Sequence, residues 1–243
     1  MSWSEREMTS LACGLCGTGL TGLPDDILLY CRGCDSVWSI ESGCPEKVAL
    51  SVLPSPEEPA LHLPFWLVEV SVERGGILVR DENCPARIEF PRELDTSAER
   101  GLEFVETKPY STKAAVPAFA CDRAAGFGSL LSSILGTMEG RPHPVRCLAG
   151  GVMSGREARE TAHAVLIAGL RRDNPGLARV DLVTETSAPS LAAVGFDPVE
   201  RGLRLAGTRF VLPYTALADA RALLCFSGHR MQSSTTDFTG HLP

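Results

Sequence analysis

Four cysteines near the N-terminus form two closely spaced pairs. The pattern is Cys13-Gly-Leu-Cys16, then fourteen residues, then Cys31-Arg-Gly-Cys34. Four thiolates in two such pairs are ligands that Zn²⁺ prefers in tetrahedral structural sites. A site of this kind leaves no coordination position open for a substrate, so it favours a structural role over a catalytic one. The sequence therefore predicts one structural zinc ion bound by Cys13, Cys16, Cys31 and Cys34.

The residues around the cysteines must form turns and short strands to bring the four sulfur atoms together. Gly14, Gly17 and Gly33 offer the backbone freedom that tight cysteine turns need. Turn-forming residues at 22–26 lead into an apolar run at 27–30, and residues 37–40 form another apolar run after the second pair. These runs predict two short strands that hold the second cysteine pair between them.

The paired cysteines resemble the zinc-ribbon superfamily over about 35 residues. The resemblance implies two cysteine knuckles on a small antiparallel sheet. It leaves the function open, because ribbons occur in transcription factors, ribosomal proteins, helicases and enzyme subunits. The later segment Leu63-Pro64-Phe65-Trp66 is similar to a Pro-Phe-Trp segment of bacterial zinc-ribbon proteins.

A rubredoxin-like iron site is the alternative for the same four cysteines, because Cys-x-x-Cys-Gly at residues 13–17 suits either metal. The second pair differs from the Cys-Pro-x-Cys-Gly form of rubredoxins, since Arg32 and Asp35 stand in place of proline and glycine. The sequence therefore favours zinc.

Charge disfavours nucleic acid and anionic membranes as partners. The chain has a net charge of −7, and residues 1–47 carry three basic and seven acidic side chains. A surface that binds polyanions is expected to be basic. The Met-Ser-Trp-Ser-Glu start lacks the basic and apolar pattern of a signal peptide, so we expect none. No apolar run reaches the roughly 18–20 residues that span a bilayer. We expect a cytoplasmic protein without membrane insertion, in which Cys44, Cys84, Cys121, Cys147 and Cys225 are reduced thiols.

The segment at residues 54–59 contains three prolines and predicts a stiff linker. We expect a zinc ribbon at residues 1–53, an α+β domain at 60–231 with a largely antiparallel, mixed sheet, and a flexible tail at 232–243. We also expect the ribbon and the larger domain to fold as separate modules.

Alternating and apolar segments predict the elements of the larger domain. Residues 68–73 alternate between apolar and polar types, and Gly75-Gly76 predicts a hairpin into residues 77–79. Ser154 and Glu157 form a capping box that opens a helix at 154–172. Further helices are predicted at 128–138 and 215–226, and further strands at 86–90, 102–105, 115–120, 145–148, 180–184 and 208–212.

Two glycine-containing segments are candidates for anion binding. Gly126-Phe127-Gly128 resembles the start of a dinucleotide fingerprint, but the third glycine and a later acidic partner are missing. Gly150-Gly151 precedes the helix at 154–172, whose N-terminus could attract a phosphate or carboxylate. The five histidines share no metal-binding spacing, and no catalytic motif is present.

The leading hypothesis is a non-catalytic adaptor or accessory subunit that contacts another protein in a larger complex. The first alternative is a nucleic-acid-associated factor that binds nucleic acid through the ribbon. The second alternative is an enzyme whose site lies within residues 60–231.

Overall fold

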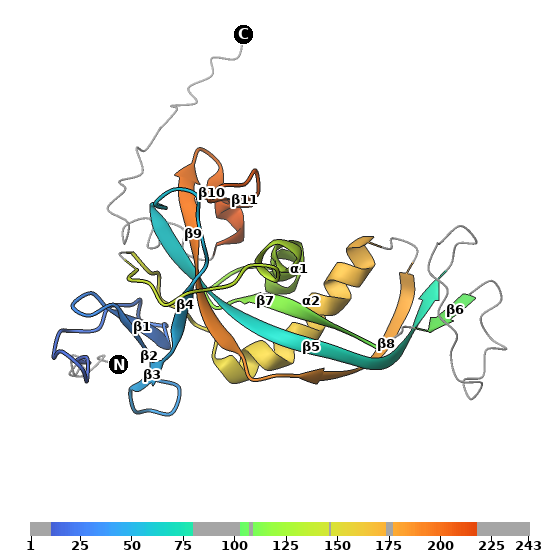
Figure 1. The fold of residues 1–243 in the computed structure, drawn as a ribbon, viewed down its shortest axis with the longest axis horizontal. Helices are drawn as coiled ribbons and strands as arrows, with labels where there is room; N and C mark the ends of the chain where they lie inside the picture. Colours follow the sequence, from blue (N-terminus) through green and yellow to red (C-terminus); the bar gives the residue numbers. More distant parts are fainter. Residues whose placement is uncertain (1–10, 80–102, 107–108, 146, 174–176, 218–243) are drawn as a thin grey trace, which may run out of the picture.

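The computed structural model describes residues 11–79, 103–106, 109–145, 147–173 and 177–217. Within them the chain forms a three-stranded sheet near the N-terminus, an eight-stranded sheet and two α-helices (Figure 1). The sheet pairings are antiparallel except for one, so the predicted α+β class with a largely antiparallel sheet is confirmed.

The small sheet carries the second cysteine pair on its first hairpin. Its strands are β1 (Leu28–Cys31), β2 (Ser36–Ser39) and β3 (Glu46–Val48), arranged antiparallel in that order. The register pairs Cys31 with Ser36 at the end of the hairpin. The two short strands predicted around the second pair are therefore present.

The large sheet is organised around one long strand, β5 (Leu61–Val79). On one side β5 pairs with β9 (Ser190–Val199) and then with β8 (Leu177–Thr186). On the other side it pairs with β7 (Tyr110–Pro117) and then with β6 (Glu103–Glu106). Figure 1 shows β5 crossing the whole molecule, so this strand links the ribbon end to the opposite end.

The outer part of the large sheet is built on β9. The strand β10 (Gly202–Leu205) pairs antiparallel with β9, and β11 (Val211–Pro213) pairs with β10. The short strand β4 (Leu50–Val52) pairs with β9 in parallel. Residues 50–52, which the sequence assigned to the ribbon, thus hydrogen-bond the large sheet. The separate folding of the two modules stays a prediction.

The predicted hairpin at Gly75-Gly76 is wrong. The strand β5 runs straight through both glycines, which pair with Leu182 and Asp181 of β8. Glycine favours a turn only when nothing else fixes the backbone. Here strands on both sides of β5 accept and donate its hydrogen bonds, and this long-range pairing overrides the local preference.

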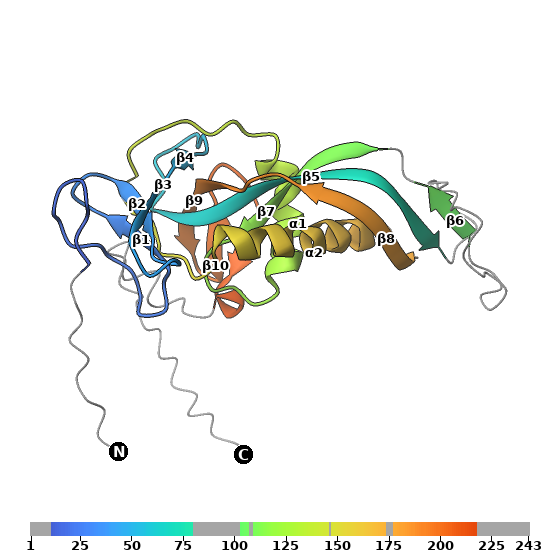
Figure 2. The ribbon, with the colours of Figure 1, turned by 90° about the horizontal axis from the view of Figure 1, so that it is seen from below.

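The two helices, α1 (Ala124–Leu135) and α2 (Gly155–Asp173), lie together beside the sheet (Figure 2). The amide of Ala115 in β7 donates to Ser132 Oγ of α1 at 2.9 Å, so α1 satisfies an amide at the edge of β7. The capping box of α2 is confirmed. The Ser154 amide donates to Glu157 Oε2 at 2.9 Å, and the Glu157 amide donates to Ser154 Oγ at 3.2 Å.

Several smaller expectations have mixed outcomes. The predicted strand at 145–148 is only an isolated bridge between Leu148 and His62, and β9 was missed altogether. Of the helix predicted at 215–226, the described residues show a 3₁₀ turn at Tyr214–Ala216. The strand predicted at 86–90 and the tail at 232–243 lie outside the described residues. No helix in the described part of the chain has the length and apolar character that a bilayer crossing requires.

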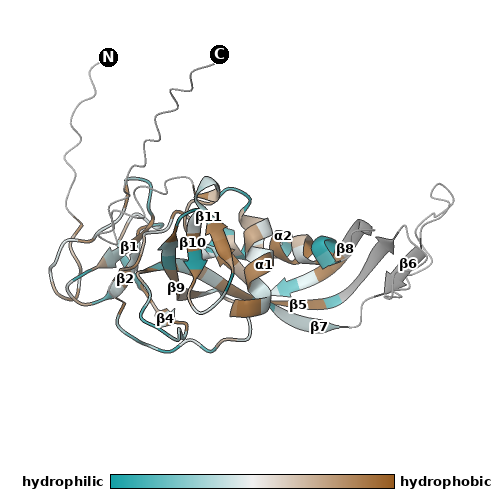
Figure 3. Ribbon diagram, turned by 90° about the horizontal axis from the view of Figure 1, so that it is seen from above, coloured by the Kyte–Doolittle hydropathy of each residue, from teal (hydrophilic) through white to brown (hydrophobic). Residues whose placement is uncertain are grey.

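Two apolar clusters hold the large sheet, and Figure 3 shows apolar residues of β5 and α1 at its centre. The first cluster surrounds Phe65, whose ring stands edge-on to Phe119 at 5.3 Å and stacks with Phe196 at 6.3 Å. The second, here called the joint cluster, combines residues from the ribbon, the large sheet and α2. Its buried ribbon members are Leu28, Tyr30 and Val37, and its other members include Trp66, Val68, Val70, Ala158, Ala162 and Val165.

Candidate metal centre

The four cysteines meet at one point although their two pairs are far apart in sequence. All four Sγ atoms lie within 4.8 Å of one another. Cys13 Sγ is 3.5 Å from Cys34 Sγ, and Cys16 Sγ is 3.4 Å from Cys31 Sγ. Four thiolates at about 2.3 Å from a tetrahedral zinc ion stand about 3.8 Å apart, so the arrangement fits the metal. No other group of three or more metal-ligating side chains occurs in the described residues.

Both cysteine pairs end in the same backbone conformation. The residue after the first pair, Gly17, has φ of 73°, and the residue after the second pair, Asp35, has φ of 54°. The Gly17 amide also donates to the Cys13 carbonyl at 2.8 Å. This left-handed step turns the chain so that both sulfur atoms of a pair face inward, and aspartate is among the residues that tolerate it. Each cysteine pair is therefore followed by the same left-handed backbone step.

Of the three glycines expected to supply backbone freedom, only Gly17 has a positive φ. Gly14 and Gly33 are needed for space instead. A Cβ on Gly14 would come within 2.9 Å of the Trp38 ring, and a Cβ on Gly33 would come within 2.4 Å of Thr18 Oγ1. Real Cβ atoms do not approach other atoms so closely, so larger side chains at these positions would push the knuckles apart.

A serine that the sequence analysis missed lies against the sulfur atoms. Ser36 Oγ is 3.1 Å from Cys34 Sγ and 3.5 Å from Cys13 Sγ, and it accepts a hydrogen bond from Trp38 Nε1 at 2.8 Å. The Leu15 amide donates to Cys13 Sγ at 3.4 Å. Hydroxyl and amide donors of this kind stabilise thiolates and orient them toward a metal. Nothing in the sequence marked Ser36, because only the β1–β2 register places it beside the cysteines.

The environment affects the four thiols unequally. Burial raises the pKa of Cys13, but hydrogen bonds from Ser36 and from the Leu15 and Cys16 amides outweigh burial and lower that pKa to about 5. Hydrogen bonds from Thr18 lower the pKa of Cys16. Burial raises the pKa of Cys31 to about 12. Cys31 would therefore ionise only in the field of a cation, so binding a divalent metal releases protons and weakens at low pH.

The ribbon is joined to the large domain through the segment 145–151. Tyr30 precedes Cys31 in β1. Its hydroxyl is within hydrogen-bonding distance of both the Asp35 carboxylate and the Val145 carbonyl oxygen. The Ile27 and Leu28 amides donate to the Gly151 carbonyl at 2.7 and 2.8 Å, and the Gly151 amide donates back to Leu28 at 3.1 Å. The metal centre is thus held by backbone bonds as well as by the joint cluster.

The contact between residues 26–28 and Gly150-Gly151 also explains why both positions are glycine. The sequence alone suggested an anion site there. A Cβ on Gly150 would lie 1.9 Å from Asp26 Oδ2, and one on Gly151 would lie 2.9 Å from Leu28 Cδ1. The glycines let the ribbon backbone approach closely, and the nearest charged group is a buried carboxylate. The hypothesis of a phosphate or carboxylate at this position is therefore disfavoured.

The dinucleotide hypothesis for residues 126–131 is disfavoured as well. Gly126 and Gly128 lie inside α1, so they form no loop that could surround a phosphate. A Cβ on Gly128 would lie 2.4 Å from the Ala115 carbonyl oxygen and 2.9 Å from Val165 Cγ2. Gly128 therefore allows α1 to pack closely against both β7 and α2.

The remaining candidate residues are dispersed over the fold. His163 lies 3.2 Å from Thr184 Oγ1, and His62, His143 and Cys147 line a pocket away from the four ligands. Cys44 is exposed and Cys121 is half-buried. His229, His241, Cys84 and Cys225 lie outside the described residues.

No family model, no curated protein and no solved structure matches this chain.

Proposed function

We propose that this protein is a non-catalytic adaptor or accessory subunit whose ribbon folds around one structural Zn²⁺ ion. The single observation that carries the proposal is the convergence of four cysteine sulfurs within 4.8 Å. Four thiolates complete the tetrahedron, so a zinc ion held there has no position for substrate or water. The ion then acts by fixing the shape of the ribbon.

The surface of the ribbon supports protein contact as the use of that shape. Leu15, between the two cysteines of the first knuckle, has 59% of its surface exposed, and nearby Leu11 has 36%. Apolar side chains held at the tip of a rigid turn are suited to a pocket on another protein. The ribbon is acidic, so phosphate groups of a nucleic acid would be repelled rather than attracted.

The metal assignment is tested by elemental analysis of the purified chain. We expect one zinc per chain in wild type, a large loss of zinc in Cys31→Ser, and full zinc in Cys44→Ser. Cys44 is the matched control because it is exposed and outside the four-sulfur cluster. Stoichiometric iron with thiolate charge-transfer absorption would contradict the zinc assignment.

The adaptor role is tested by purifying the tagged chain from its native host. We expect a stoichiometric protein partner with wild type, its loss with Leu15→Glu, and its retention with Val211→Glu, which adds the same charge at another exposed apolar side chain. Recovery of the chain without any partner would argue against an adaptor. Nanomolar, salt-sensitive binding to random DNA or RNA would favour the nucleic-acid alternative instead.

A further inference from the structure

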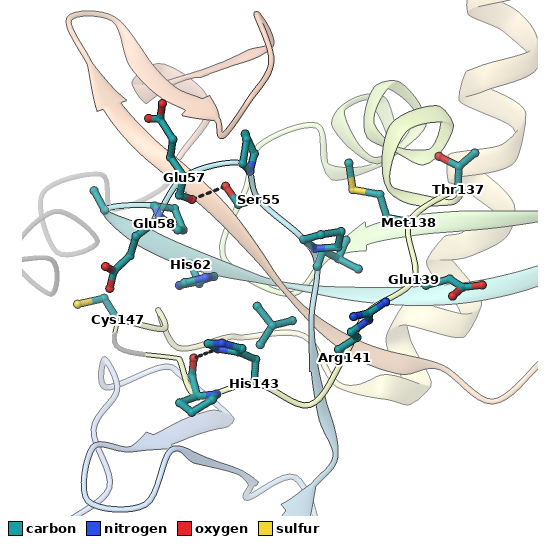
Figure 4. Close-up of a pocket in the computed structure, with 17 residues that line it drawn as sticks. Ser55, Glu57, Glu58, His62, Thr137, Met138, Glu139, Arg141, His143 and Cys147 are labelled. Atoms are coloured by element: carbon teal, nitrogen blue, oxygen red, sulfur yellow. Dashed lines mark hydrogen bonds between the residues drawn. The ribbon is translucent and has the colours of Figure 1, made fainter.

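A pocket of about 1350 Å³ lies between residues 52–60 with His62 on one side and residues 137–144 with Cys147 on the other, and its lining includes none of the four clustered cysteines (Figure 4). The prolines that the sequence interpreted as a linker form one of its walls. Its apolar lining includes Val52, Leu53, Pro54, Pro56, Pro59 and Met138. Ligand sites are typically apolar cavities with a few converging polar groups, so the polar groups of this pocket decide what it could bind.

His62 supplies a hydrogen-bond donor to the pocket. Its Nδ1 is buried and has no hydrogen-bond partner among the described residues. Burial lowers the pKa of His62, and the charge of His143 acts in the same direction while Glu58 opposes it, so the ring is neutral at neutral pH. A buried N–H without an acceptor is rarer and costlier than an unpaired lone pair. We therefore assign the proton to Nε2, the other nitrogen of this pocket-lining ring.

The backbone holds His62 in this position. Its amide donates to the Cys147 carbonyl at 2.7 Å, and its carbonyl accepts from the Ala149 amide at 3.0 Å. Arg141 is held on the other wall, where its amide and carbonyl both bond Val52, at 3.0 and 2.8 Å. The donors of the pocket thus come from two segments with fixed backbones.

Two opposite charges flank His62 in Figure 4, with Arg141 on one side and Glu58 on the other. No ion pair involves Arg141 within the described part of the chain. Figure 4 shows Glu57 and Glu139 turned away from the middle of the pocket. The charged groups left to face a ligand are therefore the Arg141 guanidinium and the Glu58 carboxylate, above an apolar wall. The other polar side chains of the lining are His62, His143, Ser55, Thr137 and Cys147.

We propose that this pocket binds a small apolar monocarboxylate. The carboxylate of the ligand accepts hydrogen bonds from the Arg141 guanidinium and the His62 imidazole, and the hydrocarbon part of the ligand packs on the proline-rich wall. Guanidinium groups pair well with carboxylates because two parallel N–H bonds match the two oxygens. The Glu58 carboxylate repels a second negative charge, so dianionic head groups are disfavoured.

The test uses the zinc-loaded full chain and four probes with the same eight-carbon tail: octanoate, octanol, octylamine and octyl phosphate. Binding is measured by calorimetry below the micelle-forming concentrations, with NMR shifts of the His62 ring as the local readout. We expect octanoate to bind most tightly and to shift the His62 signals. Arg141→Gln should weaken octanoate about tenfold, as expected for the loss of a charge-assisted bond.

Two further variants keep the test decisive. Arg171→Gln removes the same charge from the exposed end of α2 and should leave octanoate binding unchanged. Glu58→Gln should strengthen octyl phosphate relative to octanoate, and its zinc content and thermal unfolding show whether it is folded. Tighter binding of octylamine, equal octanoate binding in Arg141→Gln, or no shift of His62 at saturating octanoate would overturn the proposal.

Discussion

The ribbon and the large sheet bury their side chains by different means. In the large sheet, β5 is covered by a cluster of large apolar side chains around Phe65. On the metal side of the ribbon the buried cluster contains only Cys13, Cys31 and Trp38. So few side chains bury too little apolar surface to offset the conformational entropy of folding. We therefore expect a bound metal ion to supply the stabilisation of the folded ribbon that the apolar cluster supplies in the large sheet.

The two faces of the ribbon sheet nevertheless differ from each other. Cys31 and Trp38 lie on the side of the cysteine cluster, whereas their neighbours Tyr30 and Val37 enter the joint cluster. Successive side chains of a strand point to opposite faces. The strands β1 and β2 therefore contribute side chains both to the cluster around the cysteines and to the joint cluster. The comparison teaches that the cysteine cluster lies on one face of a sheet whose other face packs against the large domain.

Removal of zinc should give the largest effect and tests whether this connection matters. Structural zinc contributes on the order of 10 kcal/mol to the folding of small zinc-binding peptides. We expect chelation to unfold the ribbon and to lower the stability of the large domain by several kcal/mol, because the joint cluster loses its ribbon side. Urea unfolding with and without chelator measures both effects.

Two tryptophans separate the effects on the two regions. Trp38 lies in the ribbon, and Trp66 lies in β5, where its Nε1 donates to the Met153 carbonyl at 2.9 Å. Both variants are made in a background in which the third tryptophan, Trp3, is replaced by phenylalanine. With Trp38→Phe the remaining Trp66 fluorescence then reports on the large domain, and with Trp66→Phe the remaining Trp38 fluorescence reports on the ribbon. If the Trp66 transition is the same with and without chelator, the ribbon and the large domain are independent modules, as the sequence alone led us to expect.

Phe65→Ala should give the next largest effect. It disrupts the apolar cluster of the large sheet and leaves the four cysteines intact. Phe65 is fully buried between Phe119 and Phe196, and truncation of a core phenylalanine costs about 3–5 kcal/mol. We expect a lower urea midpoint but still one zinc per chain, because none of the four ligands is near the cavity. Loss of zinc in this variant would mean that the apolar cluster, and not the metal, holds the ribbon together.

Tyr30→Phe tests the hydrogen bonds of the Tyr30 hydroxyl and leaves the apolar contacts of the joint cluster in place. The change removes the hydroxyl that bonds Asp35 and the Val145 carbonyl. A buried acceptor left without a partner costs about 1–3 kcal/mol, so the loss should fall in that range. Tyr214→Phe, at a half-buried tyrosine outside the joint, is the matched control. Equal stability of the two variants would show that the joint depends on apolar packing alone.

Asp26→Asn should give the smallest effect, one that depends on pH. Burial raises the pKa of Asp26, and Asp25 acts in the same direction while the Leu23 amide opposes both. A carboxyl group whose pKa is raised on folding contributes stability at low pH, which is lost as the pH rises through the folded-state pKa. Relative to wild type, the variant should therefore be more stable at pH 7.5, and this advantage should shrink toward pH 5.5. Urea midpoints across this range measure the trend.

Asp25→Asn is the control for that experiment, because it removes the same charge from an exposed neighbour. An advantage of Asp26→Asn that stays constant with pH would show that the buried carboxyl does not change its ionisation in this range.

The convergence of the four cysteines could be predicted from the sequence because it is encoded by residue type and spacing. Two C-x-x-C pairs specify both the sulfur donors and the local turns, and Ser154 with Glu157 specifies a helix start in the same local way. Ser36, Tyr30 and the pocket could not be predicted. Their roles depend on which distant segments they meet, such as Val145 for Tyr30.

The missed and misjudged strands have a similar cause. In β9, six consecutive positions, 191–196, are buried, so no alternation marks the strand, and Gly195 and Pro198 argue locally against it. The hairpin at Gly75-Gly76 failed because β8 and β6 pair with both sides of β5 there. In both cases long-range pairing decided the structure, and a single sequence shows only local preference.

The central position of β5 has a consequence for synthesis of the chain. The strands that flank β5 along most of its length, β8 and β9, begin at residues 177 and 190, more than a hundred residues after β5 starts. On a ribosome adding about 5–20 residues per second, β5 therefore waits several seconds with an unpaired apolar edge. Unpaired edges of this kind favour aggregation. A nascent chain that ends before residue 190 should depend on chaperones, whereas the small sheet with its four cysteines is complete by residue 48 and could take up a metal ion first.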